Sequence, residues 1–187
     1  MLVGFTGAQC TGKSTLLQRC KDELLNSGPW EFVDEVTRKV ARGGHNINAQ
    51  GNDMTQLHIL KEHLENHTMS GDVILDRCIV DGFVYTNWLH DKGLVEKWID
   101  TYACNLLSFL GERLDIIFYT CPDDIPMEDD GVRSTDNEFR DNIIDIYNVL
   151  LGASWSLPGR DTWRHKVIRL SGTVDDRMET IKNTLEI

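Results

Sequence analysis

The chain has 187 residues, of which 41% are hydrophobic and 26% are charged, and this balance suits one globular domain over residues 1–187. Nineteen Lys and Arg residues against thirty Asp and Glu give a formal net charge of −11, which repels polyanions at long range. Broad electrostatic binding of DNA or RNA is therefore disfavoured, and no apolar run approaches the ~18 residues that a membrane-spanning helix needs.

The cysteines and histidines show no metal-binding pattern. Five cysteines are scattered without a C-x-x-C pair, and we expect free thiols. His63 and His67 lie four residues apart on a predicted helix, and we expect them on a solvated face. The N-terminus has neither a basic region nor a signal-type apolar core. We therefore expect a cytoplasmic protein that is a monomer or a homodimer.

The first predicted elements are an apolar strand over residues 1–6, a glycine-containing loop and a helix. The loop reads G-x-x-x-x-G-K-S, which is the P-loop pattern. Gly7 and Gly12 allow a backbone whose N–H groups point inward, and the new helix start favours an anion. Lys13 would reach the β- and γ-phosphates, and the Ser14 hydroxyl would bind Mg²⁺. The predicted ATP site consists of Gly7, Ala8, Gln9, Cys10, Thr11, Gly12, Lys13, Ser14 and Thr15.

A second strand is predicted over residues 30–33, followed by Asp34, Glu35 and a helix over residues 36–42. Parallel α/β folds place reactive groups at the carboxyl ends of strands, so these acids and Arg38 are expected to meet an acceptor. A solvated helix start, where acids are common, is the alternative. The sequence does not decide which of the two acids is the base. A polar loop and a helix over residues 53–67 follow.

The third predicted strand, residues 72–75, places Asp76 and Arg77 at its carboxyl end. This is the Walker B arrangement, in which Asp76 orients Mg²⁺ or its water and Arg77 faces a phosphate or the acceptor. An ordinary ion pair at the end of a strand is the competing interpretation. The next helix, predicted over residues 81–89, begins with Asp81, a further acceptor-binding candidate. Its aromatic side chains either stack on a base or, more commonly, pack in the core; they are Phe83, Tyr85 and Trp88.

A long amphipathic helix is predicted over residues 94–110. One apolar stripe consists of Leu94, Trp98, Tyr102, Leu106 and Leu110. A second stripe beside it consists of Val95, Ile99, Ala103 and Leu107. We expect this wide apolar face to pack against the sheet as scaffold.

The last third of the chain contains a fourth strand over residues 115–121 and an acidic span that we interpret as a lid, residues 123–140. Arg133 and Arg140 lie seven apart in this span, and both would act in catalysis by closing over the transferring phosphates. Arginine suits that role because its planar fork binds phosphate and stays charged. Ion pairing with the surrounding acids is the alternative.

The helix after this span is predicted to begin at residue 135 or 136, and a fifth strand over residues 166–170 precedes a closing helix over residues 173–185. Five strands that alternate with helices indicate an α/β protein with a three-layer parallel sheet.

The P-loop at residues 7–14, Glu35 and Arg38, Asp76-Arg77 and the Arg133…Arg140 span together resemble the P-loop nucleoside and nucleotide kinase group. This group includes thymidylate kinase, the deoxynucleoside kinases, nicotinamide riboside kinase-like ATPases and phage 5-hydroxymethyluridine DNA kinases. The resemblance covers most of the chain to about residue 151, and it implies the sheet order 2-3-1-4-5.

The resemblance also implies roles for individual residues. Glu35 or Asp34 would hold the acceptor hydroxyl or accept its proton, and Arg38, Arg77 and Asp81 would bind the acceptor. Asp76 would serve Mg²⁺ with Ser14, while Lys13, Arg77, Arg133 and Arg140 would stabilise the transferring phosphoryl. Thymidylate kinases carry an Arg-Glu-Pro-Gly type of segment after strand two, and this chain has neither Pro nor Gly in residues 34–38.

The sequence leaves several functions open. The first is an ATP- and Mg²⁺-dependent kinase of a nucleoside or nucleoside monophosphate, and the second is a kinase of a hydroxymethylated base in DNA. A partner-regulated ATPase or nucleotide-binding protein is a third, from a different class. A GTPase would need an Asn-Lys-x-Asp segment, which is absent.

Overall fold

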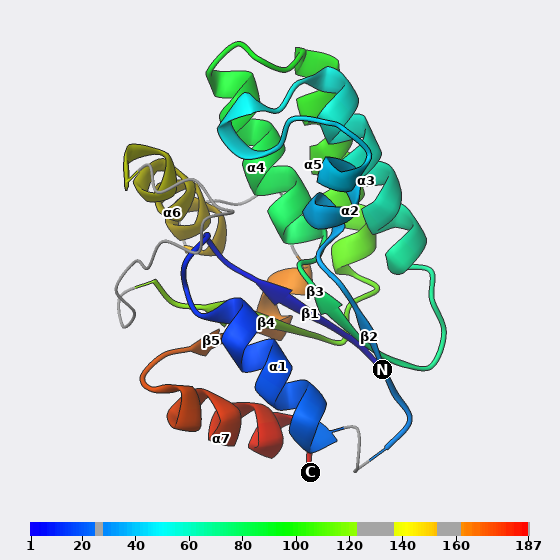
Figure 1. Cartoon of the computed structure of the whole chain (residues 1–187), viewed down its shortest axis with the longest axis vertical. Coiled ribbons are helices and arrows are strands. Elements are labelled where there is room, and N and C mark those ends of the chain that lie inside the picture. Colours follow the sequence, from blue (N-terminus) through cyan, green and yellow to red (C-terminus); the bar gives the residue numbers. More distant parts are fainter. Residues whose placement is uncertain (25–27, 123–136, 153–161, 187) are drawn as a thin grey trace.

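The computed structural model describes residues 1–24, 28–122, 137–152 and 162–186. Its middle layer is a five-stranded sheet in the order β2-β3-β1-β4-β5, and all four strand pairs are parallel (Figure 1). The strands are β1 Leu2–Thr6, β2 Trp30–Val33, β3 Asp72–Asp76, β4 Ile116–Thr120 and β5 Val167–Leu170. The predicted α/β class and sheet order are confirmed.

Helices follow the strands as the sequence predicts. They are α1 Lys13–Leu24, α2 Val36–Arg42, α3 Asp53–Asn66, α4 Ile79–Asp91, α5 Lys97–Gly111, α6 Asn137–Leu151 and α7 Val174–Leu185, with short 3₁₀ turns at Asn48–Gln50 and Thr162–Lys166. Helix α4 begins two residues earlier than predicted, because Asp81 caps the Cys78 N–H there. Thr173 and Asp176 form a capping box at the start of α7.

Two hydrophobic clusters hold the helices on opposite faces of the sheet (Figure 1). Val3 and Phe5 of β1 face α1 and α7, and they pack in a cluster with Leu16 and Ile181. The larger cluster contains residues of α3, α4, α5 and α6 together with the opposite face of the sheet. All five residues of β1 are buried, as expected of a central parallel strand.

The structure corrects the predicted orientation of α5. Its buried apolar side chains are Ile99, Ala103, Leu106, Leu107 and Leu110, and the helix packs chiefly against α4 and also against α3, within the cluster that covers this face of the sheet. Leu94, Trp98 and Tyr102, predicted in the buried stripe, are exposed. When a helix is apolar on most sides, the spacing of its apolar residues does not predict which side will be buried against other elements.

The two histidines of the α3 region also differ from the expectation of a solvated face, because His63 and His67 are both buried. The His67 Nδ1 lies 2.7 Å from the His63 carbonyl oxygen, and its Nε2 accepts a bond from the Ile79 N–H at 3.3 Å. Burial lowers the pKa of His67 to about 4 and that of His63 well below its usual value. Both are therefore neutral core residues at pH 7. Across the described residues, no helix has the length and apolar character needed to cross a membrane.

Candidate nucleotide and acceptor site

The loop between β1 and α1 has the backbone shape that a P-loop requires. Gly7 has φ +140°, and a Cβ at this position would clash with the Thr120 hydroxyl and lie 2.9 Å from the Thr120 carbonyl oxygen. Cys10 and Gly12 follow with φ of 57° and 77°, both in the left-handed region. These turns bring the start of α1, at Lys13, back against the end of β1.

Lys13 lies inside this loop rather than in solvent. Its side chain is buried, and its ammonium donates to the carbonyl oxygens of Gly7 and Ala8, both at 2.8 Å. The hydroxyls of Thr11 and Thr120 are 2.8 Å apart and anchor the loop to the end of β4. A single positive charge is thereby held at the start of α1, where the helix dipole also favours an anion.

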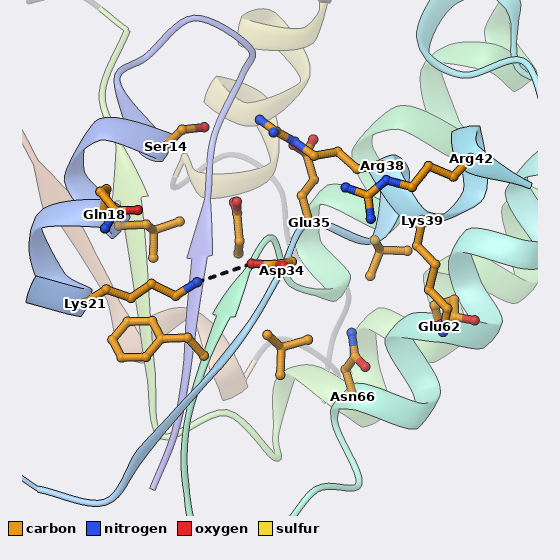
Figure 2. A pocket seen from close by; sticks show the side chains of 15 residues that line it. Ser14, Gln18, Lys21, Asp34, Glu35, Arg38, Lys39, Arg42, Glu62 and Asn66 are labelled. Atoms are coloured by element: carbon orange, nitrogen blue, oxygen red, sulfur yellow. Dashed lines mark hydrogen bonds and ion pairs between the residues drawn. The ribbon is translucent and has the colours of Figure 1, made fainter. Parts of the chain in front are cut away.

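The acidic pair after β2 divides into two different environments. The Asp34 side chain is 87% exposed and pairs with Lys21 at 3.3 Å (Figure 2). The Glu35 side chain is only 8% exposed and accepts from the Arg77 Nε at 2.7 Å and the Arg38 Nε at 3.0 Å. The structure therefore brings Glu35, and not Asp34, together with the predicted acceptor-side arginines.

Glu35 is held in its charged form. Burial alone would raise the pKa of its carboxyl, but the adjacent Arg77 guanidinium and hydrogen bonds from Thr37, Arg38 and Arg77 outweigh that effect. Its pKa therefore lies well below the usual range. The result is an ionised carboxylate in a largely desolvated position.

Arg77 is the centre of a buried ion-pair chain that joins three elements. It follows β3 with φ 73°, and its guanidinium pairs with Glu35 and with Asp81 of α4, each at 2.7 Å. A further bond of 3.3 Å reaches the Gly7 carbonyl oxygen, and the Tyr85 ring lies 5.3 Å from the guanidinium. Arg77 thus links Gly7, at the start of the P-loop, to the carboxylates of Glu35 and Asp81.

Sequence reasoning missed two residues that hold this arrangement. The buried Tyr147 hydroxyl, from α6, donates to the Asp81 carboxylate at 2.9 Å and accepts from the Gly7 N–H at 3.2 Å. Arg177 of α7 is buried and donates to the carbonyl oxygens of Thr11 and Cys121 at 2.9 and 3.2 Å. Neither residue stands in a motif, because each contacts the loop only through the tertiary fold.

Two cavities flank the start of α2. The larger, about 430 Å³, brings together Ser14 of α1 and Glu35 (Figure 2). Asp76 of β3 also lines it. The smaller, about 20 Å³, is lined by residues of α2, α3 and α4 that include Gln56, His63, Arg77, Asp81 and Tyr85. Of the three aromatic residues predicted on α4, Phe83 and Trp88 are buried in the core, and Tyr85 lines this second cavity.

Asp76 is partly buried among other charged side chains. Burial and the nearby Glu35 charge raise its pKa, and they outweigh the attraction of Arg77 and Lys13. No group of three or more His, Cys, Asp or Glu side chains that could hold a metal occurs among the described residues. A cation here would therefore rely on Ser14, Asp76 and ligands from a bound phosphate, which is the usual situation for Mg²⁺.

Part of the predicted lid is placed at the P-loop. Arg140, in the first turn of α6, donates to the carbonyl oxygens of Gln9 and Pro122, both at 3.4 Å. Phe139 beside it packs on Trp88, with ring centroids 4.6 Å apart. Arg133 and the other lid residues up to 136 lie outside the described residues. Thr15, the last residue of the predicted ATP site, is exposed on α1.

Residues 2–177, nearly the whole chain, match the model of a family described as AAA domain. The chain belongs to the AAA domain family. No curated protein is significantly similar to this AAA domain protein in sequence.

Solved structures share the fold of this AAA domain protein. A NadR protein in complex with NR matches with a TM-score of 0.68 and 20% identity over 99% of this chain and 50% of NadR. NadR in complex with NAD and AMP-PNP matches with a TM-score of 0.68 and 17% identity over 99% of this chain and 48% of that one. Deoxyadenosine kinase from M. mycoides, with the products dCMP and dCDP, matches with a TM-score of 0.63 and 13% identity over 100% and 99% of the two chains.

The AAA domain protein thus spans about half the length of the NadR chains and the full length of the deoxyadenosine kinase. At these identities the similarity establishes the fold. The predicted resemblance to the P-loop nucleoside kinase group is confirmed in its fold.

Proposed function

We propose that this protein is an ATP- and Mg²⁺-dependent phosphotransferase that moves the γ-phosphoryl group to a hydroxyl of a nucleoside. The observation that carries the proposal is the position of Glu35. Its ionised carboxylate lines the same cavity as Ser14 and Asp76, and Arg77 and Arg38 fix it there. A fixed carboxylate next to a P-loop has the means to orient an acceptor hydroxyl and accept its proton.

On the donor side, the P-loop backbone and Lys13 would bind the ATP phosphates. Arg140 reaches the Gln9 carbonyl and so stands beside the loop, where it would stabilise charge on the transferring group. The Ser14 hydroxyl and the Asp76 carboxylate would hold Mg²⁺, which supplies charge neutralisation between the β- and γ-phosphates. Arg133 has the same proposed role as Arg140, and Thr15 would complete the ATP site.

The charges around Arg77 favour a nucleoside over a nucleoside monophosphate. Glu35 and Asp81 already form ion pairs with the Arg77 guanidinium, and all three side chains are almost fully buried. A phosphate dianion placed there would meet two carboxylates and compete with them for one arginine. A neutral hydroxyl needs only to donate to Glu35. Arg38, the remaining acceptor-side arginine, is also paired with Glu35.

Structural neighbours support the same class of acceptor. The deoxyadenosine kinase structure contains dCMP as a product, which is what phosphoryl transfer to a nucleoside yields, and a NadR structure contains NR. The second NadR structure contains the ATP analogue AMP-PNP, which supports a triphosphate at the equivalent P-loop. The larger cavity, which Glu35 and Arg38 line, has the room that an acceptor would need.

The experiment is transfer of label from γ-labelled ATP with Mg²⁺ to a panel of acceptors. The panel contains nucleosides, nucleoside monophosphates, nicotinamide riboside and hydroxymethylated DNA, with water as the blank. We expect label on one nucleoside. Label on a monophosphate would overturn the argument from Arg77, and label on DNA would establish the polymer kinase. Release of free phosphate alone would instead indicate a partner-regulated ATPase.

A further inference from the structure

A hydroxyl group of the protein itself makes the contact that is proposed for the acceptor hydroxyl. Thr37, in the first turn of α2, donates from its Oγ1 to the Glu35 Oε1 at 2.6 Å. The same carboxylate oxygen accepts from the Arg77 Nε at 2.7 Å. Because Glu35 is the group that would orient an acceptor, Thr37 is already held as a substrate hydroxyl would be.

Arg77 connects this hydroxyl to the P-loop. Its Nη1 donates to the Gly7 carbonyl oxygen at 3.3 Å, and the Lys13 ammonium donates to the same oxygen at 2.8 Å. Two cations that would meet the transferring phosphoryl group therefore converge at the start of the loop. Glu35 and Thr37 lie on the other side of the same guanidinium, joined to each other by one hydrogen bond.

Other hydroxyl groups around the loop differ from that of Thr37. Thr11 donates at 3.0 Å to the Ala8 carbonyl oxygen, which cannot take up its proton. Tyr147 does contact a carboxylate, that of Asp81, but its side chain is fully buried. Thr37 is half-buried and lines the smaller cavity, so it combines a carboxylate partner with a side that is not packed.

We propose that Thr37 is an autophosphorylation site, an inference that rests on the proposed phosphotransferase function. The Thr37 Oγ1 attacks the γ-phosphorus of ATP bound at the P-loop. The bond between Oγ1 and phosphorus forms as the bond from phosphorus to the β,γ-bridging oxygen breaks, and ADP leaves with that electron pair. The hydroxyl proton passes to the Glu35 carboxylate and from there to water in the larger cavity, which Glu35 also lines.

Two features of the site favour this reaction. Phosphoryl transfer passes through a loose transition state, which needs an oriented hydroxyl more than a strong base. Glu35 supplies the orientation, because Arg77 and Arg38 both pair with its carboxylate. Thr37 belongs to the same chain as the P-loop, so the reaction is intramolecular and needs no binding step for the acceptor.

Phosphorylation of Thr37 would switch off transfer to a nucleoside. A phosphothreonine carries about two negative charges at pH 7, and it would repel the Glu35 carboxylate that its hydroxyl contacts. It would also compete with Glu35 for Arg38 and Arg77. A saturating nucleoside should protect Thr37, because the nucleoside takes the phosphoryl group first.

Incubation of the purified protein with γ-labelled ATP and Mg²⁺, without an acceptor, tests the proposal. We expect one phosphoryl group, mapped by peptide mass spectrometry to Thr37, at a first-order rate that does not depend on protein concentration. Thr37→Val should remove this label and Thr37→Ser should retain it, while Glu35→Gln should slow the labelling about 100-fold. Thr101→Val, at an exposed threonine of α5, is the matched control and should leave the label unchanged.

Transfer to nucleosides, measured in the same preparation, separates this proposal from the proposed function. Label on a nucleoside without label on Thr37 would overturn the autophosphorylation alone. So would label that persists in Thr37→Val, or label on the Lys13→Ala protein when it is mixed with the unmodified protein, since that requires transfer between molecules. Label on Thr37 alone would support the autophosphorylation and overturn the nucleoside assignment, and free phosphate with label on neither would overturn both.

Discussion

The buried ion-pair chain Glu35–Arg77–Asp81 serves two requirements at the level of single residues. Desolvated charges are stable only when they are paired, and the three charges here satisfy one another across β2, β3 and α4. The same pairing keeps Glu35 ionised and fixes its direction. Asp34, one residue earlier, lies outside this chain, because it is exposed and paired with Lys21.

This contrast predicts unequal effects of two conservative substitutions. Glu35→Gln removes the carboxylate that would hold the acceptor hydroxyl and its charge from the pair with Arg77, so kcat should fall by about 10²- to 10⁴-fold. Asp34→Asn should keep a rate within a few-fold of the unmodified protein. The measurement is steady-state kcat on the acceptor that the transfer panel identifies. Equal losses in both variants would contradict the assignment of Glu35.

Lys13 offers a second prediction at this scale, because its ammonium is buried within the P-loop. Lys13→Ala should remove most turnover, by at least ~100-fold, since it deletes the charge placed for the β- and γ-phosphates. Circular dichroism would show whether the fold persists. Asp22→Asn, at an exposed position of the same helix outside the predicted ATP site, is the control; near-normal turnover in Lys13→Ala would place the site elsewhere.

At the scale of elements, α6 connects the P-loop to the acceptor side. Tyr147 holds Asp81 and the Gly7 N–H, and Arg140 contacts the Gln9 carbonyl oxygen, so one helix contacts the loop at two points. Arg140 is half-buried, so its side chain has room to move towards a phosphate. Tyr147 is fully buried, and its hydrogen bonds stabilise the surrounding structure.

Arg140→Ala should therefore lower kcat by at least ~10-fold while leaving the melting temperature almost unchanged, because the lost charge acts in the transition state. Tyr147→Phe should do the reverse, with a lower melting temperature, since it leaves the buried Asp81 with one donor fewer. Parallel kinetics and thermal melting of the two variants test this separation. Wild-type rates in Arg140→Ala would make its contacts merely structural.

Helix α3 carries a prediction for the dependence of stability on pH. The folded state keeps His67 neutral down to about pH 4, whereas an unfolded histidine takes up its proton near pH 6.5. Between these values the unfolded chain binds more protons, so the free energy of unfolding should fall as pH falls from 6.5 to 4, by about 3 kcal/mol. Burial of His63 adds to the effect in the same direction.

Urea denaturation across this pH range measures that slope. His67→Gln should reduce it and leave the part that His63 contributes, whereas His58→Gln, an exposed position on α3, should leave it unchanged. A slope as steep in His67→Gln as in the unmodified protein would show that other groups cause the loss of stability.

The sequence predicts those parts of the fold that local pattern determines. The bounds of β2 and α2 are as predicted, and the glycines of the P-loop have the positive φ values that their spacing indicates. The sequence could not predict three features: the burial of His63 and His67, the exposure of Trp98 and the contacts of Arg177. Each depends on which element packs against which face. The same limit left Asp34 and Glu35 equivalent until the neighbouring strand supplied Arg77.

At the scale of the whole molecule, charge bears on the choice between a small acceptor and a polymer. The net charge is −11, and the side chains that line the larger cavity do not give it a net positive charge. Its cations are Lys21, Arg38, Lys39 and Arg42, and its acids are Asp34, Glu35, Glu62 and Asp76. Three of the four cations are paired with acids of the same cavity, as Lys39 is with Glu62 at 2.5 Å. The cavity offers a polyanion no net attraction.

Labelled duplex DNA should consequently show no saturable change in anisotropy with protein up to ~10 μM at low salt, a range in which non-specific DNA-binding proteins already bind. Asp34→Asn with Glu62→Gln leaves the four cations facing only two acids, so DNA affinity should rise and become steeply salt-dependent. Transfer to a nucleoside should be little affected in this variant, because neither acid contacts the Arg77 chain. Tight, salt-sensitive binding of DNA by the unmodified protein would instead favour an acceptor hydroxyl within a nucleic acid.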